Sequence, residues 1–307
     1  MNSSRRSFLQ KSAVALGAAA FTSSTWEALA NAKAKKIVGV QLYSIREDMR
    51  ADPMGTLTKL AEMGYKYVEH ANYVNRKFYG WSAQEFRKRL DGLGLKMPSG
   101  HTVMGKQHWD ESKKEFTDLW KYTVEDAAVC GQEIVISPSL DKSIRTSSSL
   151  FKTYMDVFNK SGELCQKSGM RFGYHNHDFE FSEKLDGVTL FDLIMENTDS
   201  KLVAQQLDIG NMINGGGVPA EILKKYPGRF VSMHVKDEIA SAPGHGEKYE
   251  STILGTGIIS VLEMVKLGEK KGGTKHFIIE QESYQGKKPI DCVKEDLEIM
   301  KKWGYVS

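Results

Sequence analysis

Short apolar runs typical of β-strands recur along the chain, and each is followed by a longer segment with helical periodicity. In the first run, 36–43, the valines fall on one face, while Gly39, Gln41 and Tyr43 fall on the other, because side chains alternate along a strand. We predict eight such strands, at 36–43, 65–69, 95–101, 133–137, from Arg171 into a histidine-rich segment, and at 202–208, 230–234 and 276–280.

Helical patterns fill the intervals, and several carry a recognisable start. Pro53 follows Asp52 at the first turn of one helix, and Ser82 forms a capping box with Glu85 at the start of the next. We predict helices at 53–62, from Ser82 to about residue 92, and at 110–128, 150–168, 190–196, 219–226, 258–271 and 289–303, with a long loop at 244–257.

Strands that alternate with helices predict a parallel sheet, and the length of the chain fits one (β/α)8 barrel. We therefore predict an α/β fold of the TIM-barrel type, in a single domain. An open doubly wound sheet is the alternative, but no glycine-rich phosphate loop follows the first strand. The glycines at 215–217 lack the spacing of a dinucleotide fingerprint and are interpreted as a loop.

The first 32 residues have the composition of an export signal. Arg5 and Arg6 precede an apolar run of small residues from Ser12 to Phe21, and a possible Ala-Leu-Ala cleavage site follows at 28–30. The apolar run is too short to span a membrane. We predict a twin-arginine signal peptide at 1–32, the barrel domain at 33–307, and a mature periplasmic protein that is exported folded and has no membrane span.

Net charge and cysteine content argue against nucleic acid as a partner and against a disulfide framework. The chain has a net charge of +3, and the predicted signal segment holds three positive charges and one negative charge, which leaves about +1 for the remainder. That balance argues against nucleic acid as a partner. Cys130, Cys165 and Cys292 are widely spaced and odd in number, so we expect buried free thiols. The expected partner is a small sugar or glycoside, and the protein is expected to be a monomer or a homo-oligomer.

Four predicted strands end in a side chain that binds transition metals. They supply His175, Asp208, His234 and Glu280, with His177 as an alternative to His175. Two histidines and two carboxylates suit a transition-metal ion better than Ca²⁺. In a (β/α)8 barrel the active site lies at the carboxyl ends of the strands. The pattern therefore predicts one divalent metal ion, with Mn²⁺ as the first choice and Co²⁺, Zn²⁺, Fe²⁺ or Mg²⁺ as alternatives.

Several of these segments resemble motifs of the sugar isomerase/epimerase superfamily, the xylose-isomerase-like barrels. They are Tyr-His-Asn-His at 174–177, Leu-Asp-Ile-Gly-Asn at 207–211, Met-His-Val-Lys-Asp at 233–237, Gly-Thr-Gly at 255–257 and Ile-Glu-Gln-Glu at 279–282. The resemblance covers the chain after the signal segment. It implies one divalent metal held by side chains on strands five to eight. Asp208, His234 and Glu280 match in type, whereas His175 stands where the family usually has a glutamate.

The resemblance also implies proton abstraction next to a sugar carbonyl, with the metal as the Lewis acid that stabilises the enediolate. Glu280 is the first candidate base, and His175 or His177 is an alternative if it does not bind the metal. Lys236, on the same strand face as His234, is expected to neutralise an oxyanion. His101 is expected to hydrogen-bond a substrate hydroxyl or to act as an acid. Four further residues are expected to contact substrate: Gln41, Glu69, Glu282 and, as an apolar wall, Trp109.

The superfamily resemblance favours a metal-dependent sugar isomerase or epimerase. The alternative is a lyase or dehydratase that performs β-elimination on a keto-sugar or 3-keto-glycoside. His175 favours this alternative, because a reversible epimerase would use a carboxylate in its place. A sugar-binding barrel without catalysis is a third hypothesis. A nuclease is disfavoured, because its three-metal site needs more histidine and glutamate ligands than these strand ends supply.

Overall fold

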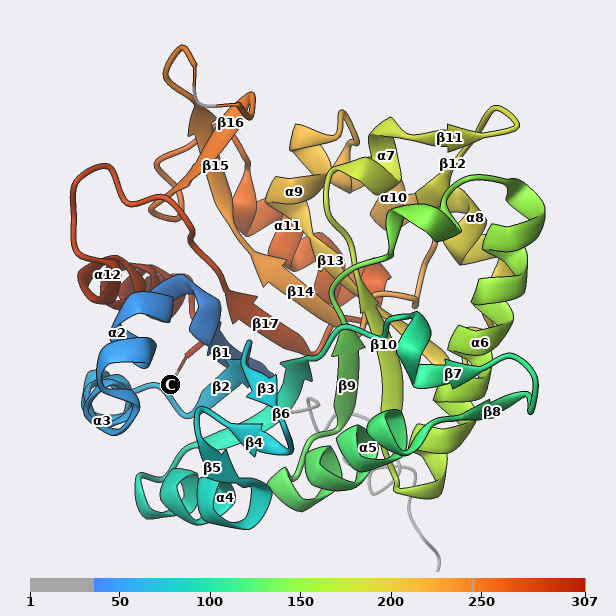
Figure 1. Ribbon diagram of the computed structural model, residues 1–307. Helices are drawn as coiled ribbons and strands as arrows, with labels where there is room; N and C mark the ends of the chain where they lie inside the picture. The colour runs from blue at the N-terminus through green and yellow to red at the C-terminus, as the bar shows by residue number, and fades with distance from the viewer. Residues whose placement is uncertain (1–35, 245, 307) are drawn as a thin grey trace, which may run out of the picture. The chain divides into compact units, whose positions relative to one another are not determined.

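The computed structural model describes residues 36–244 and 246–306, and within them eight parallel strands form a closed barrel (Figure 1). Around the barrel the strands follow the order β1-β17-β14-β13-β10-β9-β6-β2. They are β1 (Ile37–Gln41), β2 (Tyr67–His70), β6 (Lys96–His101), β9 (Ile134–Ser137), β10 (Arg171–His175), β13 (Val203–Asp208), β14 (Ser232–Val235) and β17 (His276–Ile279). Because β1 pairs with both β2 and β17, the ring is closed, which confirms the predicted TIM barrel and excludes the open sheet. The predicted signal segment, 1–32, lies outside the described residues.

Helices connect successive strands and surround the barrel (Figure 1). The longer ones are α3 (Pro53–Met63), α4 (Ala83–Gly92), α5 (Asp118–Cys130), α6 (Ser148–Lys167), α8 (Leu190–Asn197), α10 (Pro219–Lys225), α11 (Val261–Leu267) and α12 (Pro289–Lys302). Three short helices, α2 (Arg46–Ala51), α7 (Phe179–Ser182) and α9 (Ile209–Asn214), lie in the connections that follow strand ends. Among the described residues, no helix combines the length and apolarity needed to cross a bilayer.

The start signals found in the sequence act as predicted. The Asp52 side chain accepts the backbone N–H of Gly55 at the start of α3, and Ser82 and Glu85 form a reciprocal capping box at the start of α4. Gly131 ends α5 in a left-handed conformation, with φ of 79°. These local contacts satisfy helix-end groups that have no partner within the helix.

The segments between strand ends and helices contain small antiparallel sheets. The sequence pattern did not predict these sheets, and it favoured a helix over part of one of them. The predicted helix at 110–128 is wrong at its start, because 109–116 forms a hairpin and α5 begins only at Asp118. The Asp110 carboxylate accepts the N–H groups of Ser112 and Lys113, so it makes a turn there. The predicted loop at 244–257 contains a strand, and the helix expected at 258–271 begins at Val261. The small strands are β3 (Tyr73–Val74), β4 (Lys77–Phe78), β5 (Trp81–Ser82), β7 (Trp109–Asp110), β8 (Glu115–Phe116), β11 (Lys184–Leu185), β12 (Val188–Thr189), β15 (Asp237–Ala240) and β16 (Tyr249–Thr252).

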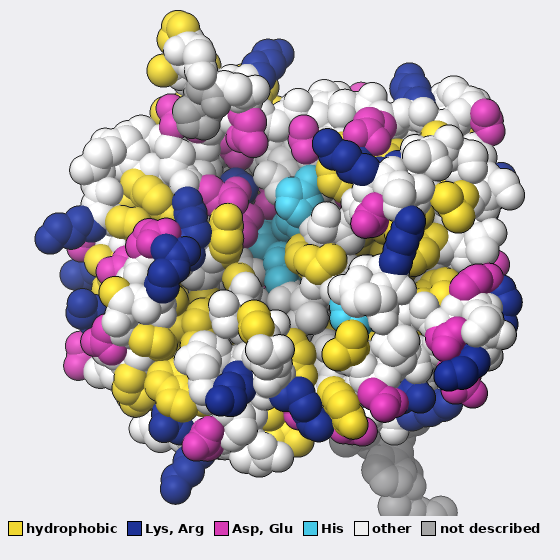
Figure 2. All heavy atoms as spheres, viewed as in Figure 1, with side chains coloured by type: hydrophobic (Ala, Val, Ile, Leu, Met, Phe, Trp, Pro, Cys, Tyr) yellow, Lys and Arg dark blue, Asp and Glu magenta, His cyan; other side chains and the backbone are white. Residues whose placement is uncertain are grey.

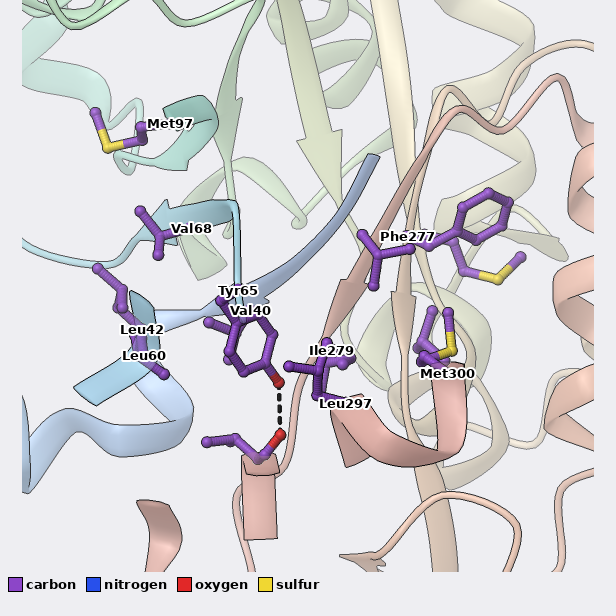
Figure 3. Close-up of a cluster of buried hydrophobic side chains, with 14 of the residues drawn as sticks. Val40, Leu42, Leu60, Tyr65, Val68, Met97, Phe277, Ile279, Leu297 and Met300 are labelled. Carbon is purple, nitrogen blue, oxygen red and sulfur yellow. Dashed lines mark hydrogen bonds between the residues drawn. The ribbon is translucent and has the colours of Figure 1, made fainter. Parts of the chain in front are cut away.

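The hydrophobic core lies mainly between the barrel strands and the surrounding helices. Figure 3 shows one part of it, where the Tyr65 hydroxyl donates to the Val293 carbonyl oxygen at 2.6 Å within a cluster of aliphatic side chains. On β10, Phe172 and Tyr174 pack outward against Phe158 of α6, with ring centroids 5.0 and 5.4 Å away. The alternate side chain, His175, therefore points into the barrel, as the strand pattern predicted.

Candidate active site

The carboxyl ends of three neighbouring strands bring potential metal ligands together. Asp208 ends β13, His234 lies on β14, and Glu280 directly follows β17. Their ligand atoms all lie within 4.8 Å of one another, and the three residues are buried, with Glu280 the most exposed at 6 %. A second group of the same kind consists of His101, His175 and His234. His234 therefore lies where the two groups meet.

His234 is held between carboxylates at both ring nitrogens. Its Nε2 lies 2.7 Å from Glu69 Oε1, and its Nδ1 lies 3.0 Å from Glu280 Oε2. Nδ1 also lies 3.6 Å from Asp208 Oδ2. Burial by itself lowers the pKa of His234, but Glu280 and Glu69 outweigh it and hold that pKa well above its ordinary value.

Glu69 lies beneath His234 and is fully buried. It accepts hydrogen bonds from Gln41 Nε2 at 2.8 Å, from Gln206 Nε2 at 2.9 Å, and from the Ser99 hydroxyl. Burial raises the pKa of the Glu69 carboxyl, but His101 and His234 more than offset this, and the pKa lies below its ordinary value. Glu69 is therefore an anion that orients His234 from behind.

Gln206 determines which nitrogens of two histidines carry protons. Its amide nitrogen donates to the Glu69 carboxylate and to the Ser232 hydroxyl, so its carbonyl oxygen faces the histidines. His101 Nε2 lies 2.6 Å from that oxygen and His175 Nδ1 lies 3.0 Å from it. Each histidine must donate to the oxygen, which leaves the other ring nitrogen of each with a free electron pair.

Three histidines form a neutral side of the site: His101 ends β6, His175 ends β10, and His177 follows β10. Burial lowers the pKa values of His101 and His177, and burial together with His234 lowers that of His175 well below its ordinary value. The His177 backbone N–H donates to Glu180 Oε2 at 2.8 Å, which holds this segment in place. Among the described residues, His177 Nδ1 is buried without a hydrogen-bond partner.

Lys236 forms the centre of the charged side, although only 2 % of its side chain is exposed. Its ammonium group pairs with Glu282 and lies 3.3 Å from both Glu280 Oε2 and Asn211 Oδ1. Asp208 Oδ2 is 3.8 Å away. Burial lowers the pKa of Lys236, but Asp208 and Glu282 outweigh it and raise that pKa well above its ordinary value. Lys236 is therefore a buried cation.

Several of these groups line a cavity of about 660 Å³, whereas Asp208, His234 and Lys236 are buried and are not among its lining residues. Figure 2 looks into the hollow, with histidine side chains at its bottom and acidic side chains beside them. The predicted site residues that line the cavity are His101, His175, His177, Glu280 and Glu282. The three histidines and the carboxylates of Glu280 and Glu282 therefore face the same cavity.

Residues 57–303 match the family described as xylose isomerase-like TIM barrel. The chain belongs to this family. It is 27 % identical over 195 residues to an inosose dehydratase from Geobacillus kaustophilus (strain HTA426), a match that covers 59 % of this chain and 60 % of that protein. The chain thus spans about three fifths of the length of this curated relative.

Two solved structures share the fold. A sugar phosphate isomerase/epimerase from Parabacteroides distasonis ATCC 8503 superposes with a TM-score of 0.76 at 25 % identity, covering 90 % of this chain and 97 % of that one. The IOLI protein, solved with a bound zinc atom, superposes with a TM-score of 0.68 at 13 % identity, covering 88 % and 99 % of the two chains. At that identity the second likeness shows the fold alone.

The donor set at the strand ends of this family member fits a divalent metal ion. Two carboxylates and an imidazole converge, and Asp208 Oδ2 is buried without a hydrogen-bond partner among the described residues. Glu69 accepts from the far nitrogen of His234, which is the arrangement that orients metal-binding histidines. Asp208, His234 and Glu280 would therefore hold the ion, with His175 nearby, its ring centroid 4.6 Å from that of His234.

Other predicted site residues of the barrel lie away from the cavity. Gln41 and Glu69 are fully buried below the site, where they bond to one another. Trp109 lies in the β7–β8 hairpin, where its indole N–H donates to Glu111 and its ring packs against Phe116 at 5.0 Å. None of the three lines the cavity that holds the histidines.

Sequence reasoning missed Gln206, Ser99 and Asn211. Gln206 lies two residues before Asp208 on the same strand, so the alternation of strand side chains could have identified it as inward-facing. Asn211 lies in α9, and Ser99 carries no signal of its own beyond its place on a strand. Their roles depend on contacts with residues distant in sequence.

Proposed function

We propose that this protein is a divalent-metal-dependent carbon–oxygen lyase that performs β-elimination on a keto-sugar or a 3-keto-glycoside. The observation that carries the proposal is the division of the site, with neutral histidines at the ends of β6 and β10 opposite charged groups at the ends of β13, β14 and β17. The similarity to an inosose dehydratase favours elimination over the isomerase or epimerase interpretation.

Asp208, His234 and Glu280 are the proposed ligands of the metal. When bound, a divalent ion supplies Lewis-acid charge next to the substrate carbonyl. The zinc atom of the IOLI protein, which has the same fold, supports a divalent ion in this barrel. Because Glu280 is occupied as a ligand in this arrangement, the proton transfers fall to the histidine side.

His177 is the proposed base. It lines the cavity, and its pKa is lowered by burial so that the ring is neutral near pH 7. It takes the proton from the carbon next to the carbonyl. The electron pair of that C–H bond forms the new C=C bond, the C–O bond at the β-carbon breaks, and the departing oxygen takes the proton from His177.

Lys236 is proposed to stabilise negative charge on the substrate, and His101 is proposed to orient the substrate. The Lys236 ammonium group stabilises the negative charge that develops on the carbonyl oxygen. His101 donates to Gln206 through Nε2, so its Nδ1 accepts a hydrogen bond from a substrate hydroxyl. Glu282, which lines the cavity and pairs with Lys236, holds the ammonium group in position.

Product analysis in D₂O tests the reaction type. The metal-loaded protein is incubated separately with a 3-keto-glycoside and with a free ketose, and products and deuterium incorporation are followed by NMR. We expect release of the aglycone from the keto-glycoside. Interconversion of a ketose pair, with the keto-glycoside left intact, would show that the elimination proposal is wrong.

A histidine variant tests the assignment of the base. We expect His177→Gln to lower kcat by at least about 100-fold, the usual contribution of a general base. His276→Gln is the control, because His276 is a more deeply buried histidine that begins β17 at the opposite end of the barrel. Equal loss in the two variants would indicate a general effect on folding.

We also propose that the protein acts outside the cytoplasm. The proposal is supported by the paired arginines and short apolar run in 1–32. Replacing Arg5 and Arg6 with lysine should retain the protein in the cytoplasm, as cell fractionation would measure, and unchanged export would contradict the proposal.

A further inference from the structure

We propose that the outer wall of the catalytic cavity is an apolar subsite that binds the aglycone of the substrate, and that the preferred substrates are keto-glycosides with an aromatic aglycone. The inference rests on the proposed elimination, because the aglycone is the group that such a reaction releases. It adds the chemical class of the leaving group, which the charged floor of the site does not determine.

Large apolar side chains that are exposed to solvent gather at this cavity. Of the ten such residues in the described part of the chain, five line it and the other five do not. The five are Tyr43, Val74, Val103, Leu119 and Tyr122. Leu119 is 56 % exposed and Val74 is 58 % exposed. Exposed apolar groups that cluster around one cavity indicate a ligand that covers them.

The apolar wall and the histidine floor belong to one continuous space. His101, His175 and His177 line the same cavity as Leu119 and Tyr122. Its volume of about 660 Å³ falls within the range of about 300–1,000 Å³ typical of pockets for drug-sized ligands. A single sugar ring on the floor would leave the outer part unfilled. A ligand that reacts at the floor and also covers the wall must carry a second group.

The wall is held rigidly before any ligand binds. The β3–β4 hairpin lies against α5, where Arg76 forms two hydrogen bonds of 2.8 and 3.0 Å to the Asp126 carboxylate. The same guanidinium lies 4.1 Å from the centre of the Tyr122 ring. Arg76 has a backbone φ of 60°, which is unfavourable for a residue other than glycine, so its contacts must hold it in this conformation. This geometry fixes the Tyr122 ring as a flat surface at the cavity.

The chemistry of the wall favours an aromatic group over a second sugar. Asn75, Thr102, Gln107 and Ser139 also line the cavity. Val74, Val103 and Leu119, however, offer no hydrogen bonds, so a sugar lying over these three side chains would leave its hydroxyls on that side unpaired. The Arg76 guanidinium is already engaged by Asp126. Aliphatic side chains and the flat Tyr122 ring match an aromatic ring, which needs contact area and no hydrogen bonds.

Paired substrates and paired variants test the subsite. Activity of the metal-loaded protein is measured on methyl, phenyl and glucosyl 3-keto-glucosides, with Leu119→Ser compared with Leu150→Ser. Leu150 is an exposed leucine near the start of a helix, like Leu119, but it lies away from the cavity. We expect wild-type kcat/KM to be highest for the phenyl glycoside. Leu119→Ser should lower the phenyl-to-methyl ratio about ten-fold, and Leu150→Ser should leave it unchanged.

Three results would overturn the subsite. They are a preference for the glucosyl substrate, an unchanged phenyl-to-methyl ratio in Leu119→Ser, and an equal change in Leu150→Ser. If wild-type protein releases no aglycone from any of the three, the proposed elimination fails, and equilibrium binding then decides the subsite. In that case phenyl β-glucoside should still bind about ten-fold more tightly than methyl β-glucoside to the wild-type protein. The Leu119→Ser variant should not show this difference. Equal binding of the two glucosides would reject the subsite, leaving a macromolecular partner as the remaining explanation for the exposed wall.

Discussion

Glu69 controls the charge and orientation of His234 without reaching the cavity. It receives hydrogen bonds from Gln41, Gln206, Ser99 and His234, so all of its oxygen lone pairs point at donors. A carboxylate behind a metal-binding histidine raises the basicity of that ligand and fixes its ring.

We predict that Glu69→Gln lowers metal affinity about 10- to 100-fold, the range found for partners behind metal ligands. The amide is nearly isosteric but places a donor group where His234 or Gln206 needs an acceptor. Chelator competition measures the dissociation constant directly. Glu85→Gln, in the capping box of α4, is a control that should leave the affinity unchanged. Unchanged affinity in Glu69→Gln would mean that His234 does not bind the metal.

At the residue scale, side chains on strand ends were the predictable part of the site. Asp208, His234 and Glu280 could be proposed together, because alternation and strand order place them on one edge of the barrel. The buried role of Glu69 was not predictable, because it depends on the depth of its side chain relative to His234. Trp109 lies in a hairpin because the Asp110 carboxylate accepts the N–H of Ser112 and makes a turn there. This turn was missed in the sequence because the pattern predicted a helix from residue 110.

Among the elements, the connection after β14 is organised by one carboxylate. Asp237 accepts four backbone N–H groups, from Glu238 and Ile259 at one oxygen and from Gly255 and Gly257 at the other. The contacts lie between 2.8 and 3.0 Å. They fold the Gly-Thr-Gly segment back onto β15, which begins directly after Lys236.

We predict that Asp237→Asn destabilises the protein by about 2–4 kcal/mol, because two of the four N–H groups would face an amide donor and lose their acceptor. The midpoint of urea unfolding measures this change. Asp141→Asn is the matched control, since the exposed Asp141 carboxylate accepts only one backbone N–H, from Ser143, among the bonds of the described residues. Similar midpoints for the two variants would contradict the proposed role of Asp237.

Helix α12 contains a buried carboxyl that should make stability depend on pH. Burial raises the pKa of Asp296 to about 8, while its Oδ1 accepts the N–H of Leu254 at 2.9 Å. The unfolded value is about 3.9. Between about pH 3.9 and about pH 8 the Asp296 carboxyl therefore holds a proton in the folded state but not in the unfolded state. Its contribution to stability is lost progressively as the pH rises through this range and past about 8.

We predict that Asp296→Asn is more stable than the parent at pH 9 by at least about 1.4 kcal/mol, the equivalent of one pKa unit. The amide imitates the protonated acid, so the two proteins should be nearly equal only below the unfolded pKa of about 3.9, and their stabilities should diverge as the pH rises above it. Urea unfolding across this range measures the difference, with the exposed Asp291→Asn as a control on the same helix. Parallel stability curves would show that Asp296 is ionised in the folded protein.

For the whole barrel, the fold was predictable because many weak signals agreed. Eight apolar runs, helix caps such as Ser82 and helix stops such as Gly131 all favoured alternation of strands and helices. The apolar wall of the cavity was not predictable, since Tyr43, Val74 and Leu119 come from separate segments without a shared motif. Only closure of the barrel places them around one space.

The proposed metal joins strands that are distant in the chain, so its binding should stabilise the barrel as a whole. Asp208, His234 and Glu280 lie on three successive strands of the ring. A ligand that binds only the folded state adds about 2.7 kcal/mol at 100 times its dissociation constant. For a domain of this size, that corresponds to a rise in Tm of roughly 5–10 °C.

We predict that chelated protein melts at a lower temperature and that one of Mn²⁺, Co²⁺, Zn²⁺, Fe²⁺ or Mg²⁺ restores the Tm. Thermal unfolding with each ion in turn also ranks the candidate metals. Asp208→Ala should abolish the rise, because it removes one of the three converging ligands, whereas Asp156→Ala, on the exposed face of α6, should keep it. An equal rise in both variants would show that the ion binds elsewhere, and the metal-dependent part of the proposed reaction would then have to be abandoned.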